Sequence, residues 1–161
     1  QISITMNNEI TLREALKNDV PVLLQYEQEV VKAERPMDPT IRNNDVQYYD
    51  LDALIENPRA TLMVACDGDK IVATGYALEK QARPYLDHET YAYLGFMYTD
   101  PEYRGRGING KIVEALQHWA MNIGLTEIRL HVYEENEPAI KAYEKKGFKR
   151  HMIEMRLRTE S

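Results

Sequence analysis

The chain of 161 residues has a single cysteine, Cys66, so no disulfide can form within it. No apolar run reaches the length of a membrane span, and no signal-peptide pattern is present. Lys and Arg form no block, and the formal net charge is −6. A negative chain has no electrostatic attraction to a phosphate backbone. We therefore expect a cytoplasmic protein with no nucleic-acid or membrane partner.

Metal-ligand spacing is also absent. His88, His118 and His151 have no ligand-like spacing with one another or with Cys66. A lone cysteine on an apolar strand is typical of an inert core residue rather than a nucleophile. The sequence therefore predicts no metal site and no thiol chemistry.

Hydrophobic residues make up 43% of the chain, which argues against disorder. The length suits one domain with a workable core, so we expect a single domain over residues 1–161. The first eight residues begin with Gln1 rather than Met. We expect them to be either a remnant of expression or a disordered end.

Periodicity and turn residues predict an alternating order of elements. The order is a strand, two helices, three strands, a helix, a strand, a helix and a last strand region, which indicates a mixed α/β domain. The predicted strands cover 9–15, 60–66, 71–79, 90–99, 127–133 and one or two segments of 148–158, with a hairpin turn at 67–70 and a bulge at Gly75. The predicted helices begin near Asn18 or Asp19 and at 44, 108 and 137, the last three ending near 56, 123 and 146.

The segment from Tyr103 to Lys111 is rich in glycine and joins a predicted strand to a predicted helix. Glycine frees backbone N–H groups to face an anion, and the helix dipole adds positive charge there. The segment fits three nucleotide-site patterns: G-x-G-x-x-G, G-x-x-x-x-G-K and R-x-x-G-x-G/A. A glycine-rich turn without a ligand is the fourth interpretation.

The context of the segment weakens two of these patterns. A P-loop needs Ser or Thr after its lysine, and this chain has Ile112. A Rossmann loop follows its strand almost directly, whereas Pro101 and its neighbours intervene here. A Rossmann domain also needs several further strand–helix units, for which the residues after Gly110 are too few.

The third pattern resembles the acetyl-CoA loop of the GNAT superfamily of N-acetyltransferases, with Arg104 and Gly107 in place. A second family pattern, N-x-x-A-x-x-x-Y-x-x-x-G-F, is complete in this chain, with its residues at Asn136, Ala139, Tyr143, Gly147 and Phe148. The resemblance covers most of the chain and is strongest from Leu94 to Phe148. One departure is Asn109, which stands where the family usually has Gly or Ala.

The resemblance implies a GNAT fold, a mixed central sheet flanked by helices on both faces, and acetyl-CoA as co-substrate. It also implies that Tyr143 protonates the leaving thiolate and that Asn136 helps to bind coenzyme A, a role that a plain helix N-cap can share. The pantetheine arm would pair with a strand edge, and the pyrophosphate would meet the loop. The implied edge residues are Met97, Tyr98 and Thr99, and the loop residues are Arg104, Gly105, Arg106, Gly107, Ile108 and Asn109.

A general base is harder to assign, because Gly95 and Phe96 occupy the strand where many relatives carry a glutamate. In some relatives an acidic base lies five residues before the Asn136 position, where this chain has His131. Histidine titrates near neutrality, so His131 is a candidate base, with a hydrogen-bonded or solvated strand histidine as the alternative.

The acceptor is expected to be a small-molecule or peptide amine, near the first two helices and the last strands. Acids and tyrosines in these segments suit a cation, or an ordinary acidic surface; they are Glu34, Asp38, Asp45, Tyr48, Tyr49, Asp50, Tyr85 and Asp87. A homodimer is compatible with the family. The alternatives to an enzyme are a non-catalytic acyl-CoA-binding module and a dinucleotide-binding protein.

Overall fold

The computed structural model describes residues 9–160, so the expectation for residues 1–8 lies outside the described residues. The chain divides into two compact units, residues 1–131 and residues 132–161. The single-domain interpretation stays a prediction.

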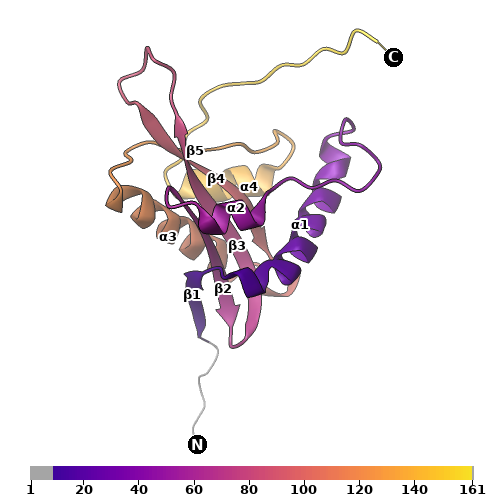
Figure 1. Cartoon of the computed structure of the whole chain (residues 1–161). Coiled ribbons are helices and arrows are strands. Elements are labelled where there is room, and N and C mark those ends of the chain that lie inside the picture. Colours follow the sequence, from indigo (N-terminus) through magenta and orange to yellow (C-terminus); the bar gives the residue numbers. More distant parts are fainter. Residues whose placement is uncertain (1–8, 161) are drawn as a thin grey trace, which may run out of the picture. The chain divides into compact units, whose positions relative to one another are not determined.

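The first unit is built on a five-stranded sheet in the order β1-β2-β3-β4-β5 (Figure 1). Strands β1 to β4 pair antiparallel, and β5 pairs parallel with β4, so the sheet is mixed. The predicted hairpin turn is confirmed, since β2 ends at Asp67, β3 begins at Lys70 and Gly68 has a positive φ of 61°. The strands are β1 (Ile10–Glu14), β2 (Ala60–Asp67), β3 (Lys70–Gln81), β4 (Thr90–Thr99) and β5 (Ile128–Leu130).

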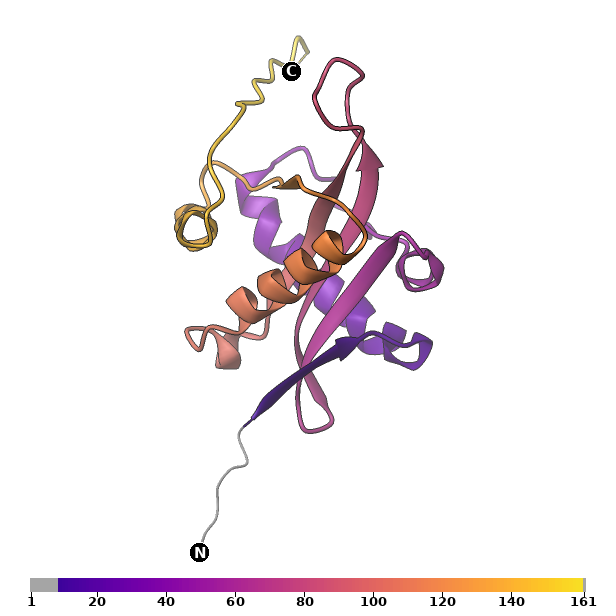
Figure 2. The same cartoon turned by 90° about the vertical axis from the view of Figure 1, so that its left-hand side faces the viewer.

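Helices cover both faces of this sheet, as predicted (Figure 2). The helices are α1 (Val20–Glu34), α2 (Leu51–Glu56) and α3 (Ile108–Asn122), with 3-10 turns η2 (Lys17–Asp19), η3 (Arg35–Met37) and η4 (Pro101–Tyr103). Leu23 of α1 and Leu51 and Leu54 of α2 pack on one face with Tyr76 and Phe96 of the sheet. Helix α3 lies on the other face, where Ala120 packs with Ala92 of β4 and Leu125. Cys66 is buried in the core on the α1 face.

A bulge interrupts the pairing of β3 with β4. Thr74 lies opposite Tyr98, whereas Tyr76 lies opposite Gly95, so β4 has one extra residue here. The predicted irregularity at Gly75 is therefore present, but the extra residue belongs to β4. Phe96 adopts a φ of 52°, and its carbonyl accepts a hydrogen bond of 2.7 Å from the Thr74 hydroxyl. A bulge bends a strand locally, and β5 pairs with β4 only upstream of it, at Ala92 to Leu94.

The second unit contains α4 (Glu137–Lys145), and both ends of this helix are capped. The side chain of Asn136 accepts from the Ala139 N–H at 3.3 Å. At the other end, Gly147 has a φ of 102° and donates to the Glu144 carbonyl, while Phe148 donates to the Tyr143 carbonyl. Those two bonds are a Schellman motif, and the rings of Tyr143 and Phe148 pack at 5.8 Å to complete it.

Three sequence predictions of secondary structure were wrong in extent. The predicted helix over 44–56 begins only at Leu51, because Asp50 caps it and the N–H groups of Tyr48 and Tyr49 donate to Glu27 instead. The predicted strand over 127–133 ends at Leu130, where pairing with β4 ends.

The strand region predicted over 148–158 forms no strand in the described chain. Four of its apolar side chains, Met152, Ile153, Met155 and Leu157, are between 80% and 89% exposed. An alternating sequence becomes a strand only when another strand satisfies its backbone, and this segment lacks a ladder partner in the structure.

Candidate functional site

The glycine-rich segment forms a tight turn into α3. Gly105 and Gly107 have φ values of 78° and 77°, a region that glycine enters without strain. Gly107 caps α3, and the first intrahelical bond runs from the Lys111 N–H to the Gly107 carbonyl. The three preceding N–H groups, at residues 108–110, therefore point out of the helix end, where a helix attracts an anion. Asn109 lies in regular helix, so its side chain requires no special backbone conformation.

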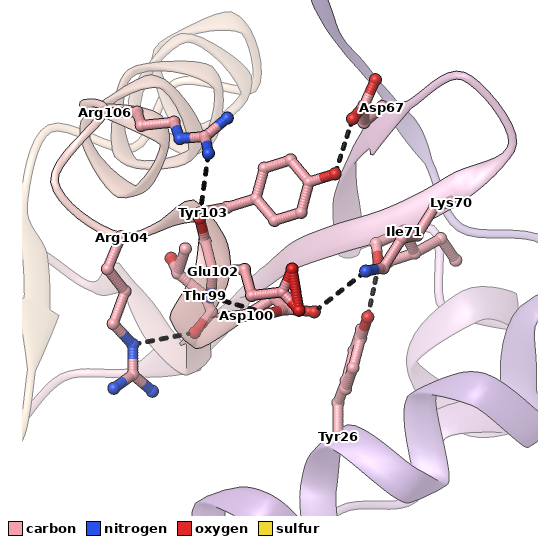
Figure 3. A network of polar contacts seen from close by, with 10 residues as sticks. All are labelled: Tyr26, Asp67, Lys70, Ile71, Thr99, Asp100, Glu102, Tyr103, Arg104 and Arg106. Atoms are coloured by element: carbon pink, nitrogen blue, oxygen red, sulfur yellow. Dashed lines mark hydrogen bonds and ion pairs between the residues drawn. The ribbon is translucent and has the colours of Figure 1, made fainter.

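The arginines of the loop contact its backbone (Figure 3). Arg104 Nε donates to the Thr99 carbonyl at 3.1 Å, and an Arg106 terminal nitrogen donates to the Glu102 carbonyl at 3.0 Å. Both side chains are exposed. Each guanidinium carries five N–H donors, so these contacts hold the loop and leave other donors for a phosphate.

Tyr103 connects the loop to the β2–β3 turn (Figure 3). Its hydroxyl donates to an Asp67 carboxylate oxygen at 2.6 Å, and this bond is the main cause of a raised Tyr103 pKa. The Arg106 guanidinium lies 4.7 Å from the centre of the Tyr103 ring, and the Lys70 ammonium lies 5.3 Å from it. Sequence reasoning missed this cluster because Asp67 and Tyr103 lie far apart along the chain.

Strand β4 offers an open edge beside the loop. Pairing with β5 stops at Leu94, so the predicted edge residues Tyr98 and Thr99 pair with β3 alone, while Met97 lies in the bulge, outside the β3–β4 register. The Asp100 N–H bonds back to Val72 on β3, and backbone direction alternates along a strand, so the amide group of Thr99 points away from β3. Tyr98 differs, because its side chain is buried on the α1 face beside Tyr26.

His131 follows the last residue of β5 and is exposed. Its Nδ1 lies 3.2 Å from the Tyr93 hydroxyl of β4, and the two rings meet edge to face at 5.2 Å. Tyr93 packs against the core of the α1 face, whereas Ile128 of β5 packs against the α3 face. The structure thus places His131 on the α1 side of the sheet, next to a tyrosine that sequence reasoning had not selected.

The predicted acceptor residues do not form one group. Tyr48 packs edge to face on Tyr49. Burial is the main cause of the raised pKa values of Tyr49 and Tyr93, and the Glu34 charge adds to both. Burial is the main cause of a raised pKa at Glu34 itself. Asp50 instead caps α2, Asp38 accepts from Thr40, Asp87 pairs with His88, and Tyr85 is exposed in the β3–β4 loop. Asp45 lines a hollow of about 570 Å³ between α1 and residues 45–47.

The second unit holds the other two predicted site residues. Asn136 acts as the N-cap of α4, and Tyr143 is half-buried with a pKa that burial raises to about 12. A phenol with that pKa is fully protonated near neutrality. Tyr143 can therefore donate a hydrogen bond or a proton, and it carries no charge.

The part of the chain that the structure describes contains no helix long and apolar enough to cross a membrane. Within residues 9–160, no three His, Cys, Asp or Glu side chains gather as metal ligands.

Comparison with known proteins finds acetyltransferases that are similar to this chain in sequence or in fold. The chain is 28% identical over 148 residues to thialysine N-epsilon-acetyltransferase from Sus scrofa, covering 86% of this chain and 83% of that protein. It is 34% identical over 103 residues to aminoglycoside N(6′)-acetyltransferase type 1 from Klebsiella aerogenes, covering 61% of this chain and 64% of the relative. A solved structure described as a predicted acetyltransferase with acetyl-CoA, from Clostridium acetobutylicum, shares the fold with a TM-score of 0.75 and 21% identity, covering 93% of this chain and 96% of that chain.

The model of the acetyltransferase (GNAT) family matches residues 27–148, a range that includes the glycine loop, His131 and the capped helix α4. That range is well over half of the chain. The chain therefore belongs to the GNAT family of acetyltransferases.

Proposed function

We propose that this protein transfers an acetyl group from acetyl-CoA to a primary amine by direct attack of the amine on the thioester. The observation that carries the proposal is the junction of β4 and α3. Glycines in the left-handed conformation expose three amides at the start of α3, and residues 100–107 connect this helix start to a strand edge that β5 leaves open. This combination fits a pyrophosphate joined to an amide-bearing arm, because one part takes the anion and the other pairs like a peptide strand.

The residues at this junction suit the phosphates and the pantetheine arm of coenzyme A. The amides at 108–110 and the free donors of Arg104 and Arg106 would hold the pyrophosphate, and the edge at Met97 and Thr99 would pair with the pantetheine arm. Asn136 would add its amide while it caps α4. A phosphate-binding helix start with flanking arginines suits a ligand of several negative charges.

An amine as acceptor agrees with the names of the relatives, which give an amino nitrogen as the acceptor atom. A free alkylamine has a pKa near 10.4, so only about one molecule in a few thousand is neutral and nucleophilic at pH 7. His131 is the proposed base, acting directly or through a water, because it lies at the rim of the α1 face with its ring ordered by Tyr93.

Acetyl transfer makes one bond to carbon, breaks another, and requires one proton for the leaving sulfur. The amine nitrogen forms a bond to the acetyl carbon, the carbon–sulfur bond breaks, and the electron pair leaves with sulfur. Tyr143 donates a proton to that sulfur and regains one from solvent. His131 or water takes the proton of the ammonium form, and solvent takes the second proton that nitrogen loses on acylation. The raised pKa of Tyr143, about 12, keeps it in the donating form at all ordinary pH values.

Thermal unfolding with acetyl-CoA, NAD and ATP in parallel tests the ligand class. A rise in Tm with acetyl-CoA alone is expected, and a rise with NAD alone would overturn the proposal. Release of free thiol in the presence of a panel of amines then tests catalysis.

The Tyr143→Phe variant separates an enzyme from a non-catalytic acyl-CoA-binding module. We expect kcat to fall about 100-fold, within the usual range for a positioned acid, while the Kd for acetyl-CoA changes little. An unchanged rate of thiol release in this variant would remove Tyr143 from the mechanism.

A further inference from the structure

An ammonium group of the chain itself lies on the face of Tyr93. The Nζ of Lys80 is 4.1 Å from the centre of that ring, within the range of a cation–π contact. Lys80 belongs to β3, where it pairs with Tyr91 and is therefore diagonal to Tyr93. Within residues 9–160, Lys80 has no carboxylate partner, and the adjacent Glu79 pairs with Arg59.

The surroundings of Tyr93 favour a cation more than the ring alone does. Burial is the main cause of a raised Tyr93 pKa, and the Glu34 charge adds to it; no Lys, Arg or His of the described chain forms an ion pair with Glu34. Tyr76 stands beside Tyr93 with ring centres 6.4 Å apart. A half-buried carboxylate beside aromatic rings is a site where a positive charge relieves the cost of burial.

His131 restricts what such a cation can be. Its Nδ1 contacts the Tyr93 hydroxyl, so the proposed base and the cation site share one tyrosine. The attacking nitrogen must lose its proton, whereas the ring face and Glu34 favour a group that keeps its charge. The two roles therefore fall to two separate groups of the acceptor.

We infer that the face of Tyr93, next to Glu34, is a binding site for a second positive group of the acceptor, and that Lys80 occupies this site when the acceptor is absent. This inference rests on the proposed function, because it assumes that the protein acetylates an amine. It assigns the substrate class as a compact amine with at least two positive charges. It also makes Lys80 an internal competitor that any such substrate displaces.

The direct test is binding of tetramethylammonium, and of a bis-quaternary alkane, to the protein without acetyl-CoA, measured by calorimetry. These probes have no N–H group and cannot be acetylated. Lys80→Met keeps the length of the side chain and removes its charge, so it should tighten binding about three- to tenfold. Lys32→Met, at an exposed position of α1, changes the net charge equally and should have a smaller effect.

Two substitutions of Tyr93 control for folding. Tyr93→Leu removes the ring and should weaken probe binding about three- to tenfold, whereas Tyr93→Phe keeps the ring and should bind nearly as the parent does. Equal binding by the Lys80→Met and Lys32→Met variants, or by the two Tyr93 variants, would overturn the inference.

Turnover distinguishes failure of this inference from failure of the proposed function. Diamines should give a kcat/KM at least tenfold above monoamines of the same length, and Glu34→Gln should remove most of that preference. Turnover without any preference for diamines would overturn the inference and leave acetyl transfer standing. Probe binding that depends on Lys80 and Tyr93, without turnover of any amine, would support the cation site and end the proposed function.

Discussion

Glu27 of α1 is a fully buried carboxylate, and it holds the loop that precedes α2. One carboxylate oxygen accepts from the Tyr48 N–H at 2.5 Å and from the Tyr49 N–H at 2.9 Å. Two further hydrogen bonds hold the same loop. The Gln28 side chain donates to the Val46 carbonyl, and the Arg35 side chain donates to the Asn44 carbonyl. Glu27 thereby sets the position of the two tyrosines beside Glu34.

We expect Glu27→Leu to reduce the free energy of unfolding by about 3 kcal/mol, because two N–H groups would stay buried without an acceptor. The reference is Glu29→Leu, at an exposed position two residues along the same helix, which should change stability by less than about 0.5 kcal/mol. Urea unfolding of both variants measures the difference. Equal stabilities would show that Glu27 does not hold the loop.

If Tyr143 is the general acid, as proposed, its pKa determines how activity depends on alkaline pH. Its pKa is raised by burial to about 12, above the ordinary value of 10, so the protonated donor persists as the pH rises and is lost only near pH 12. The pH profile of kcat should therefore show no loss of a general acid between pH 9 and about 10.5. A fall in kcat with an apparent pKa near 10, present in the parent and absent in Tyr143→Phe, would contradict this assignment.

At the scale of elements, the second family pattern forms helix α4, and the pattern itself contains the residues that cap both ends of this helix. Asn136 satisfies the start of α4, and Gly147 with Phe148 closes its end onto Tyr143. Each contact joins residues within five positions of one another, which is why the helix was predicted within one residue of its bounds. The glycine loop was predicted for the same reason, since its geometry depends on local backbone freedom.

Strand β3 carries a glycine that packing requires. A Cβ at Gly75 would lie 2.6 Å from Cγ2 of Ile112 in α3 and 2.7 Å from the sulfur of Met97 in β4. Gly75→Ala should therefore reduce stability by about 3 kcal/mol, because α3 has to move off the sheet.

Gly68→Ala is the comparison for that variant. Gly68 has a positive φ in the hairpin turn, but a Cβ there meets nothing within 4 Å. Gly68→Ala should therefore lower the free energy of unfolding by about 1 kcal/mol, the cost of placing alanine in the left-handed backbone region. Denaturant unfolding that ranks Gly68→Ala as the more damaging change would contradict the packing argument.

At the scale of the whole molecule, the formal net charge of −6 predicts how acceptors arrive. A negative surface attracts cations over about a Debye length, which shortens as salt is added. The kcat/KM for a dicationic amine should fall about threefold between 20 and 300 mM NaCl, and that for a zwitterionic amine should change much less. Equal salt dependence for the two acceptors would exclude steering by the protein charge.

Topology separates this chain from a dinucleotide-binding domain. A Rossmann sheet is mostly parallel, whereas three of the four strand pairings here are antiparallel and only the pairing of β4 with β5 is parallel. The glycine loop alone fitted both interpretations, because three amides at a helix start bind a pyrophosphate in either fold.

The sequence by itself determined the features that depend on contacts between residues close together in the chain. These are the order of elements up to α4, the hairpin at 67–70, the glycine loop and the caps of α4. Short-range hydrogen bonds and backbone preferences decide these, so their signals lie side by side in the chain. Only the tertiary structure decided the bulge at Phe96, the early end of β5, the unpaired segment 148–158 and the grouping of Lys80, Tyr93 and His131. Each of these depends on which distant strand or helix supplies a partner, and no local pattern encodes that choice.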